Sequence, residues 1–356
     1  MQPRVTLRDI AAKAGVHHTT VSRALKDDPR VGTETLAKIR ALAKGMGYMP
    51  DPMLSSLNAY RHASRAHQYH GTVAWITNFA ARDGWRGSFC YRLYFQGASD
   101  QLMRHGYRLE EFWLREPGMT ARNSSQVLFN RGVRGLLICP LMISRGHLSL
   151  QWERFSAVSF GYSLVRPKLH LFSAAHYRAM ITCMRELRAM GYRRIGMVTS
   201  HEMNERMDRM WTAAYYAAQP VLPVKKTIPI LLLGEHARPS SAPNNFHLQV
   251  LKWYRAYKPE AIISPTVPVA EWLIEAGYRL PKDVAVVNTS LHQEIFVSGI
   301  VEDSREIGRA AADFLVGMLQ RGEYGVPSTP QRVLLEGNWF AGTTTPHQDQ
   351  AVLAVR

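Results

Sequence analysis

The sequence predicts an α/β protein in two parts: a small helical module at the amino terminus and a larger region in which strands and helices alternate. Two observations support this prediction. Residues 6–25 show two short amphipathic helical patterns joined at a glycine, and apolar runs of strand length alternate with helical patterns from residue 72 onward. The chain has 356 residues, 46% of them hydrophobic, which is enough for a small module and a large core.

The first helix pair, residues 6–25, has the spacing of a helix-turn-helix. Its helices cross closely, so a small residue is needed at Ala11 and a residue that tolerates a positive φ at Gly15, while Thr6 can cap the first helix. The apolar positions that would pack the pair are Ile10, Ala14, Val16, Val21 and Leu25. The outer face of the second helix keeps His18, Thr19, Ser22 and Arg23. An ordinary helical hairpin has similar spacing, but this polar face also suits DNA.

A third helix is expected over residues 33–44. It has apolar residues at helical spacing (Leu36, Ile39, Leu42 and Ala43) and ends toward Gly45 and Gly47. Three packed helices would make residues 1–50 a self-supporting module.

Residues 4–58 resemble the DNA-binding headpiece of the lactose-repressor (LacI/GalR) family of bacterial regulators. The family motif is matched by Thr6, Asp9, Ala11, Ala14, Gly15, Val16, Thr20, Val21, Ser22 and Arg23, and the match continues through Val31, Thr35 and Gly47-Tyr48-Met49-Pro50. The resemblance implies phosphate contacts from Thr6, Ser22, Thr35 and Tyr48, and base contacts from His18, Thr19 and Arg23. His17 and Thr20 belong to the same DNA-facing set. Arg23 is the strongest candidate base reader, because arginine to guanine is the commonest specific contact.

Residues 51–70 are expected to form a hinge helix and a linker. Asp51 can cap a helix and Pro52 suits its first position, but two turns are too short to hold themselves in water. In the family this segment pairs across a dimer, and a leucine at the position of Leu57 wedges between base steps in the minor groove. Leu54 stands where the family usually has a small alanine. A plain flexible linker is the alternative.

The positive charge of the chain suits a polyanionic partner or simply reflects a basic surface, and the cysteine content fits a reducing compartment. The formal net charge is +16, and residues 1–65 have 11 basic and 5 acidic side chains, so most of the excess lies elsewhere. Cys90, Cys139 and Cys183 are far apart, which argues against a disulfide framework or a zinc clamp. No secretion signal or span of about 20 apolar residues is evident, so we expect a soluble, cytoplasmic protein without membrane association.

Three histidines in the linker, His62, His67 and His70, raise the question of a metal site. No carboxylate or cysteine completes a ligand set, and a solvated basic linker explains the same residues. The prediction is that the chain has no metal and no cofactor.

From residue 72 the alternation predicts parallel sheets covered on both faces. Strands are expected over 72–77, 109–114, 135–139, 195–199, 228–233 and 261–264, and helices over 93–105, 176–190, 205–218 and 246–254. The joints Gly106-Tyr107-Arg108, Gly191-Tyr192-Arg193 and Gly277-Tyr278-Arg279 each follow a helix, where glycine supplies a left-handed cap.

Residues 71–342 resemble the effector domain of the same family, which is similar to periplasmic sugar-binding proteins: two Rossmann-like lobes with a ligand cleft between them. The supporting stretches are residues 131–138, 190–196, 281–287 and 306–311. The resemblance implies three crossings between lobes, near residues 165, 292 and 325. Lobe 1 would then comprise about 71–165 and 293–325, and lobe 2 about 166–292 and 326–342, followed by a tail over 343–356.

Candidate effector ligands lie on both lobes. By the resemblance, Arg206 matches an arginine that often grips the ligand. Two family aspartates that bond sugar hydroxyls are replaced here, by Thr266-Val267 and by Asn288-Thr289-Ser290, which leaves Ser290 as a candidate but puts ordinary binding of a neutral sugar in doubt. The loop after the first strand offers Asn78, Trp85 and Phe89, which could stack on a ring or merely pack the lobe.

An enzyme is the competing class of function. The sequence lacks a Gly-x-Ser-x-Gly elbow, a phosphate loop and a His-Glu-x-x-His helix; His201-Glu202 has no second histidine at the required spacing. The favoured hypothesis is a homodimeric repressor that binds a pseudo-palindromic operator and responds to a small effector, such as a sugar or related metabolite. The alternative is the same DNA-binding role with a degenerate effector site, controlled by a partner protein or by no ligand.

Overall fold

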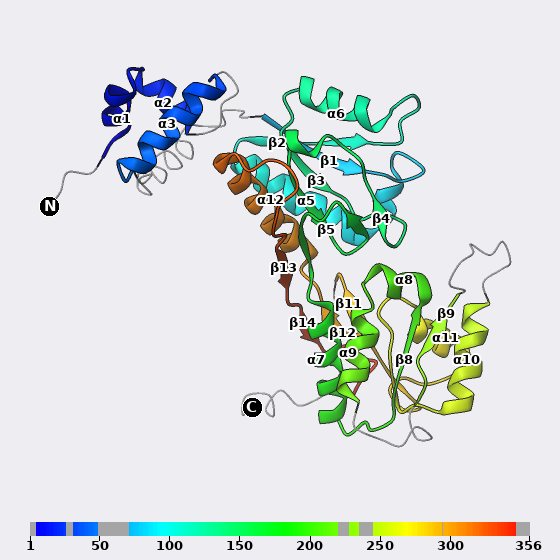
Figure 1. The fold of residues 1–356 in the computed structure, drawn as a ribbon. Helices are drawn as coiled ribbons and strands as arrows, with labels where there is room; N and C mark the ends of the chain where they lie inside the picture. The colour runs from blue at the N-terminus through cyan, green and yellow to red at the C-terminus, as the bar shows by residue number, and fades with distance from the viewer. Residues whose placement is uncertain are drawn as a thin grey trace.

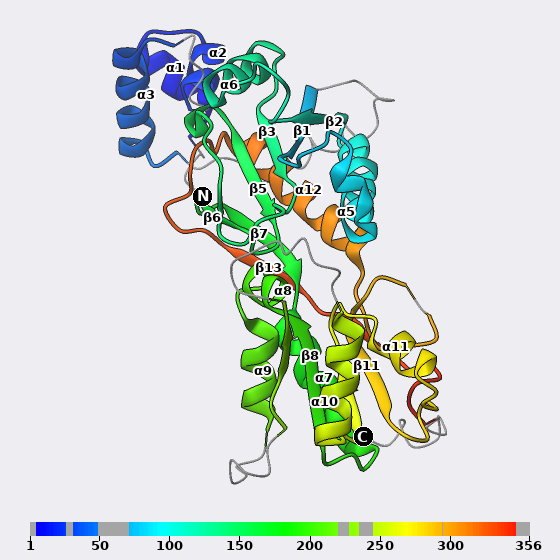
Figure 2. The ribbon, with the colours of Figure 1, turned by 90° about the vertical axis from the view of Figure 1, so that its right-hand side faces the viewer.

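The computed structural model describes residues 5–25, 31–48, 71–219, 228–234, 245–293 and 295–346. They form a headpiece and two larger bodies, called lobe 1 and lobe 2, which are joined end to end (Figures 1 and 2). The predicted hinge with Leu57, the linker histidines and most of the predicted tail lie outside the described residues.

The headpiece consists of α1 (Leu7–Ala14), α2 (His18–Ala24) and α3 (Thr33–Gly45). Its buried core consists of Ile10, Ala11, Ala14, Val21, Ala24, Ile39 and Ala43, and all of these except Ala24 were predicted to pack the module, whereas the predicted Leu36 and Leu42 are only half-buried. Val16, Leu25 and Tyr48 pack against this core from partly buried positions. Three short helices therefore bury one shared core, as the sequence predicts.

The joints of the headpiece also follow the sequence prediction. Thr6 caps α1 in a capping box: its hydroxyl accepts a hydrogen bond from the Asp9 amide, and the Asp9 carboxylate accepts one from the Thr6 amide at 2.7 Å. Gly15 ends α1 with a φ of 71°, a left-handed conformation that glycine adopts without steric cost.

Lobe 1 is built on a six-stranded parallel sheet in the order β13-β7-β5-β3-β1-β2. Its strands are β1 (Gly71–Thr77), β2 (Tyr107–Trp113), β3 (Gly135–Ile138), β5 (Ser156–Phe160), β7 (His170–Ala174) and β13 (Arg332–Leu335). One face packs on α5 (Phe89–Arg104) and α12 (Ser304–Arg321), and the other face packs near α6 (Ala121–Asn130). The minor elements are η1 (Gly84–Gly87), η2 (Trp152–Arg154) and the pair β4 (Gly146–His147) and β6 (Leu164–Arg166).

Lobe 2 has a second six-stranded sheet in the order β14-β12-β11-β10-β8-β9. Its strands are β8 (Ile195–Ser200), β9 (Leu231–Leu233), β10 (Ala261–Ile263), β11 (Ala285–Leu291), β12 (Ser298–Val301) and β14 (Asn338–Phe340), and only β14 runs antiparallel among the pairs described. The helices α7 (His176–Ala189) and α9 (Met210–Ala218) cover one face, and α10 (Phe246–Tyr257) and α11 (Val269–Glu275) cover the other. The prediction of parallel sheets covered on both faces is confirmed.

The crossings between lobes lie about ten residues later than the sequence analysis placed them. β7 pairs with β5 in lobe 1, so the first crossing follows Ala174, not residue 165. β12 still pairs with β11 in lobe 2, so the second lies near Glu302, not residue 292. β13 returns to lobe 1 beside β7, so the third lies between Leu335 and Asn338, not near residue 325. β7 and β13 of lobe 1 therefore come from segments that the sequence analysis assigned to lobe 2, and β12 of lobe 2 comes from a segment that it assigned to lobe 1.

The predicted helix over residues 205–218 is also wrong as a single element. The chain forms α8 (His201–Arg206) and α9 (Met210–Ala218) instead. Asp208 and Arg209 between them have positive φ values of 52° and 57°, which no α-helix can accommodate.

No helix among the described residues combines the length and the apolar character needed to cross a membrane.

Candidate functional sites

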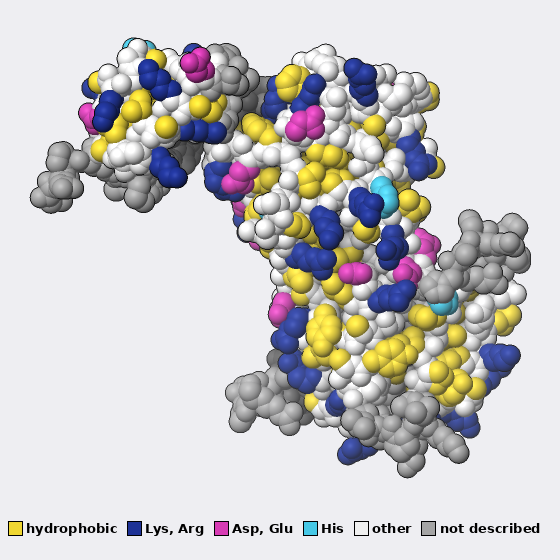
Figure 3. All heavy atoms as spheres, in the orientation of Figure 1, with side chains coloured by type: hydrophobic (Ala, Val, Ile, Leu, Met, Phe, Trp, Pro, Cys, Tyr) yellow, Lys and Arg dark blue, Asp and Glu magenta, His cyan; other side chains and the backbone are white. Residues whose placement is uncertain are grey.

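The exposed face of α2 is the candidate DNA-binding surface. His17, His18, Thr19 and Arg23 are exposed there, whereas Val21 and Ala24 on the opposite side are buried in the headpiece core. Lys and Arg side chains are spread over the visible surface of the headpiece (Figure 3). A short helix that presents donors, acceptors and a cation from a rigid core has the form needed to enter a major groove.

Three predicted DNA contacts, His17, Thr19 and Thr6, are engaged in local hydrogen bonds. His17 is the N-cap of α2, and its Nδ1 lies 2.8 Å from the Thr19 hydroxyl. The Thr6 hydroxyl donates to the Asp9 carboxylate at 2.7 Å, which together with the Thr6 amide lowers the pKa of Asp9. Thr20, Thr35 and Tyr48 are half-buried at the edges of the same module, and Ser22 lies within α2. The helices therefore bring the predicted set together on one small body, with Leu57 outside the described residues.

The second candidate site lies where the strands of the two lobes end. In open parallel sheets, ligands bind beyond the carboxyl ends of the strands. Arg206 in α8 follows β8 of lobe 2, and its Nη2 donates to the Tyr91 hydroxyl at 2.7 Å and to the Leu141 carbonyl at 2.9 Å. Tyr91 belongs to α5 and Leu141 follows β3, so both acceptors are in lobe 1. The ends of the strands of both sheets thus face each other at Arg206.

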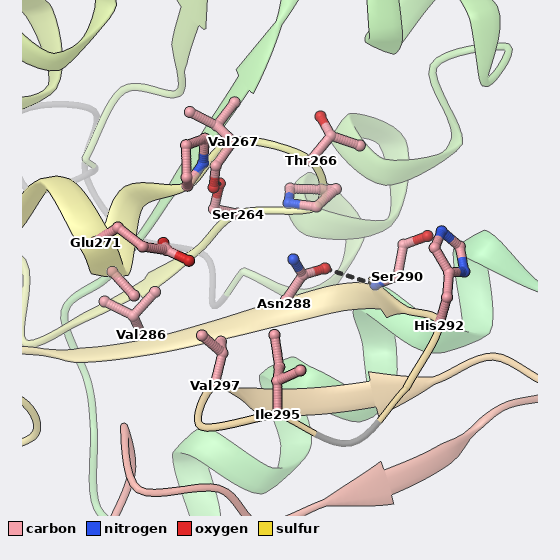
Figure 4. A pocket seen from close by; sticks show the side chains of 13 residues that line it. Ser264, Thr266, Val267, Glu271, Val286, Asn288, Ser290, His292, Ile295 and Val297 are labelled. Atoms are coloured by element: carbon pink, nitrogen blue, oxygen red, sulfur yellow. Dashed lines mark hydrogen bonds between the residues drawn. The ribbon is translucent and has the colours of Figure 1, made fainter. Parts of the chain in front are cut away.

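The lobe 2 side of this junction contains two hollows. The larger, of about 340 Å³, lies beyond the ends of β10 and β11, and its polar lining includes Ser264, Thr266, Glu271, Asn288, Ser290 and His292 (Figure 4). The second, of about 330 Å³, is lined partly by Ser200, Phe246 and Trp272. Thr266, Val267 and Pro268 line both hollows. Such a mixture of hydroxyls, an amide and apolar walls suits a small hydroxylated ligand.

The structure corrects one predicted effector residue and leaves four as candidates. Trp85 is 1% exposed and packs against Trp75 and Phe95, and its indole N–H donates to Glu111 at 3.0 Å, so it belongs to the lobe 1 core and cannot stack on a ligand. Phe89 remains 40% exposed at the start of α5, with the Arg92 guanidinium over its ring. Asn78 is half-buried and accepts a hydrogen bond from Arg115 at 3.0 Å. Ser290 lines the larger hollow, and Arg206 is buried between the lobes.

The sequence analysis missed a buried polar cluster at the crossings between lobes. Glu302 is 4% exposed, and its carboxylate lies 3.4 Å from His176 Nδ1 and 3.8 Å from His292 Nδ1. His292 also lines the larger hollow and lies 3.3 Å from the hydroxyl of Ser304, the first residue of α12. Burial lowers the pKa of His292, an effect that His176 reinforces and Glu302 opposes. Residues of the first and second crossings therefore meet beside the candidate effector site.

No sequence signal pointed to this cluster, because His176 lies more than one hundred positions before His292 and Glu302 in the chain. Tyr91 is the missed residue that the sequence could most readily have indicated, because it lies only two positions after the predicted effector residue Phe89.

Among the described residues, no group of three or more His, Cys, Asp or Glu side chains is arranged to hold a metal ion.

Comparison with known proteins identifies both parts of the chain. Residues 6–51 match the family model described as bacterial regulatory proteins, lacI family, and residues 184–345 match a periplasmic binding protein-like domain. The probable HTH-type transcriptional repressor ExuR of Bacillus subtilis (strain 168) is 47% identical over 53 residues, which are 15% of this chain and 16% of ExuR. The match to this curated relative therefore spans about one sixth of its length.

Solved structures share the fold over nearly the whole chain. The lac repressor dimer bound to operator and the anti-inducer ONPF has a TM-score of 0.55 at 17% identity, covering 96% of this chain and 99% of that one. The transcriptional regulator CelR in complex with cellobiose has a TM-score of 0.53 at 18% identity, covering 96% and 100%. The headpiece match and the two-lobed fold agree with the geometry described above. The amino-terminal part of this chain is therefore similar to the bacterial regulatory proteins of the lacI family, and its larger part is similar to periplasmic binding protein-like domains.

Proposed function

We propose that this protein is a sequence-specific DNA-binding transcriptional regulator that acts as a repressor. It binds a pseudo-palindromic operator as a homodimer in the cytoplasm, and a small-molecule effector controls its affinity. The observation that best supports this proposal is the exposed polar face of α2 on a packed three-helix headpiece, in a chain whose residues 6–51 match the lacI family model. Its relatives include repressors, so we assign binding and not catalysis to the chain.

Within this function, base reading falls to His18, Thr19 and Arg23, and phosphate contacts to Thr6, Ser22, Thr35 and Tyr48. His17 and Thr20 complete the DNA-facing set. Leu57 is proposed as the minor-groove wedge, so Leu57→Ala should weaken operator binding and reduce DNA bending together. Unchanged bending in a gel-phasing assay would show that Leu57 is not the wedge.

The proposed effector is a sugar or a related hydroxylated metabolite, bound between the lobes near Asn78, Phe89, Arg206 and Ser290. The hollows of lobe 2 have room for such a molecule, and the relative CelR was solved with cellobiose. A thermal-shift panel of cellobiose, glucose, galactose, glucuronate and inorganic phosphate would test this class. A ligand that raises the unfolding temperature of the protein but not of Ser290→Ala would support the site.

The second candidate is a regulator with the same DNA-binding role but no small-molecule response, or a response to a partner protein. Two observations favour it. Residues 266–267 and 288–290 lack the carboxylates expected from the resemblance. In addition, the Arg206 Nη2 group already donates hydrogen bonds to Tyr91 and Leu141 of the protein itself. No thermal shift with any compound, combined with intact operator binding, would favour this candidate.

The decisive experiment for DNA binding is selection of bound duplexes from a random library with the full-length protein. We expect a two-fold symmetric consensus. In fluorescence anisotropy at near-physiological salt, the selected duplex should bind at least about a thousandfold more tightly than a scrambled duplex. Equal retention of both duplexes would refute the proposed function.

A further inference from the structure

The contacts of Arg206 join the two lobes. The side chain rises from α8 of lobe 2, is 5% exposed, and finds its two close acceptors in lobe 1: the Tyr91 hydroxyl at 2.7 Å and the Leu141 carbonyl at 2.9 Å. The nearest carboxylate of its own lobe, on Glu202, is 3.9 Å away and belongs to a side chain that is 66% exposed. Lobe 1 therefore supplies both acceptors of the Arg206 Nη2 group.

Both acceptors are fixed within lobe 1. The amide of Leu141 donates to the Ser163 hydroxyl at 2.7 Å, which holds the segment after β3 in place. The Tyr91 ring stacks on Tyr94 and meets the edge of Phe79. Burial raises the pKa of Tyr91, and the nearby Arg206 only partly offsets this effect, so the hydroxyl stays neutral and can accept from the guanidinium. Lobe 1 thus offers a preformed acceptor pair.

Arg206 is equally well positioned on the lobe 2 side. The Ser200 hydroxyl caps α8 by accepting from the Met203 amide at 3.1 Å. Asn204 accepts from the Thr212 hydroxyl at 3.0 Å, which ties α8 to α9 across the break at Asp208 and Arg209. This break ends α8 immediately after Arg206. Arg206 is held by lobe 2, and its acceptors are held by lobe 1. The geometry of their contact therefore depends on the relative position of the two lobes.

The guanidinium also has one buried donor without a partner, since Arg206 Nε has no hydrogen-bond acceptor. A buried donor in this state is costly, and arginine can present Nε and a terminal nitrogen together to one ligand group. An effector oxygen that took this position would share or replace the lobe 1 acceptors.

We propose that Arg206, Tyr91 and Leu141 form an interlobe latch that holds the two lobes together. The guanidinium then has two alternative sets of acceptors, the lobe 1 pair and the effector, and exchange between them changes the arrangement of the lobes. The consequence for operator binding rests on the proposed function, but the latch itself does not.

Hydrogen–deuterium exchange of the full-length protein without added ligand tests the latch directly. Tyr91→Phe removes the hydroxyl acceptor and keeps the ring. We expect amides in residues 139–143 and 201–206 to exchange about threefold to tenfold faster than in the wild type. Arg206→Lys, which keeps the charge but loses the fork, should act in the same direction on both segments. Because the two segments belong to different lobes, a common response reports on the contact between them.

Tyr94→Phe is the matched control, since it removes a buried hydroxyl from the same helix, and that hydroxyl interacts with Cys90 inside lobe 1. Its exchange in residues 201–206 should equal that of the wild type. Unchanged exchange of these residues in Tyr91→Phe, or an equal effect of Tyr94→Phe, would overturn the latch. Anisotropy with the selected operator duplex separates the two proposals: loss of sequence preference in the wild type refutes the function, whereas the exchange result judges the latch alone.

Discussion

Arg23 is the exposed cation of α2, and its contribution can be separated from that of the general positive charge. A bidentate contact to a guanine is sequence-specific, whereas attraction to phosphates is the same for every duplex. We therefore predict that Arg23→Ala weakens binding to the selected operator by about 1 to 3 kcal/mol and relaxes the preference at one base pair per half-site. Fluorescence anisotropy with single-base operator variants measures both effects.

The control for Arg23 is Thr35→Ala, at a proposed phosphate contact. This change should weaken binding to operator and scrambled duplexes by a similar factor, because phosphates carry no sequence information. If Arg23→Ala also weakened both duplexes equally, Arg23 would be a phosphate contact and not a base reader.

Single residues show where reading the sequence succeeds and where it stops. The capping role of Thr6 could be predicted, since its partner Asp9 lies three positions away. The burial of Trp85 in the lobe 1 core could not be predicted, because its hydrogen-bond partner Glu111 and its ring neighbour Trp75 come from two adjacent strands, β2 and β1. An aromatic residue in a loop is equally compatible with a ligand site and a core, and only the packing of distant segments decides between them.

At the scale of elements, the close crossing of α5 and α12 depends on two glycines. A Cβ at Gly308 would lie 2.1 Å from the Tyr94 carbonyl oxygen, and one at Gly97 would lie 1.9 Å from the Arg305 carbonyl oxygen. Backbone atoms cannot yield as a flexible side chain can, so the helices would have to separate. We predict that Gly308→Ala destabilises the protein by about 1 to 3 kcal/mol or more, measured by the midpoint of chemical unfolding.

Gly87→Ala is the matched control for this prediction, because a Cβ at Gly87, in the same lobe, meets nothing within 4 Å. Its effect should stay within about 0.5 kcal/mol. Equal stability of Gly308→Ala and the wild type would mean that the two helices are not tightly packed in solution.

Elements with a strong local signal were predictable, and those set by long-range pairing were not. The alternation of strands and helices and the glycine joints follow from hydrophobic periodicity and left-handed caps; Gly106, Gly191 and Gly277 all have positive φ. The break between α8 and α9 escaped prediction, because nothing in residues 205–218 marks Asp208 and Arg209 as left-handed. The crossings were misplaced because β7, β12 and β13 are buried or edge strands whose partners, not their own residues, decide their lobe.

For the whole molecule, the effector site and the crossings form one connected region. His292 lines the larger hollow, approaches Glu302 at one crossing, and contacts Ser304 at the start of α12 in lobe 1. Arg206 of lobe 2 makes a second connection, to Tyr91 in α5 of lobe 1. A ligand in the hollow would therefore contact His292, which itself contacts the second crossing between the lobes. Such a contact can couple ligand binding to a change in the arrangement of the lobes.

This placement of His292 gives the protein a specific response to acid. Burial lowers the pKa of His292 below its ordinary value of 6.5, so the folded state favours the neutral imidazole and the unfolded chain binds more protons. The stability that depends on His292 is therefore complete above the unfolded pKa and is lost as the pH falls below it. Burial also lowers the pKa of His170, so the total loss of stability in acid has more than one source.

We predict that His292→Asn, which cannot take up the proton, shows a smaller drop in unfolding free energy between about pH 7.5 and about pH 5.5 than the wild type. Denaturant midpoints measured across this range test it, with the exposed His147→Asn as the control that should follow the wild-type profile. Parallel profiles for the wild type and His292→Asn would mean that His292 is accessible to water and free to protonate in the folded protein.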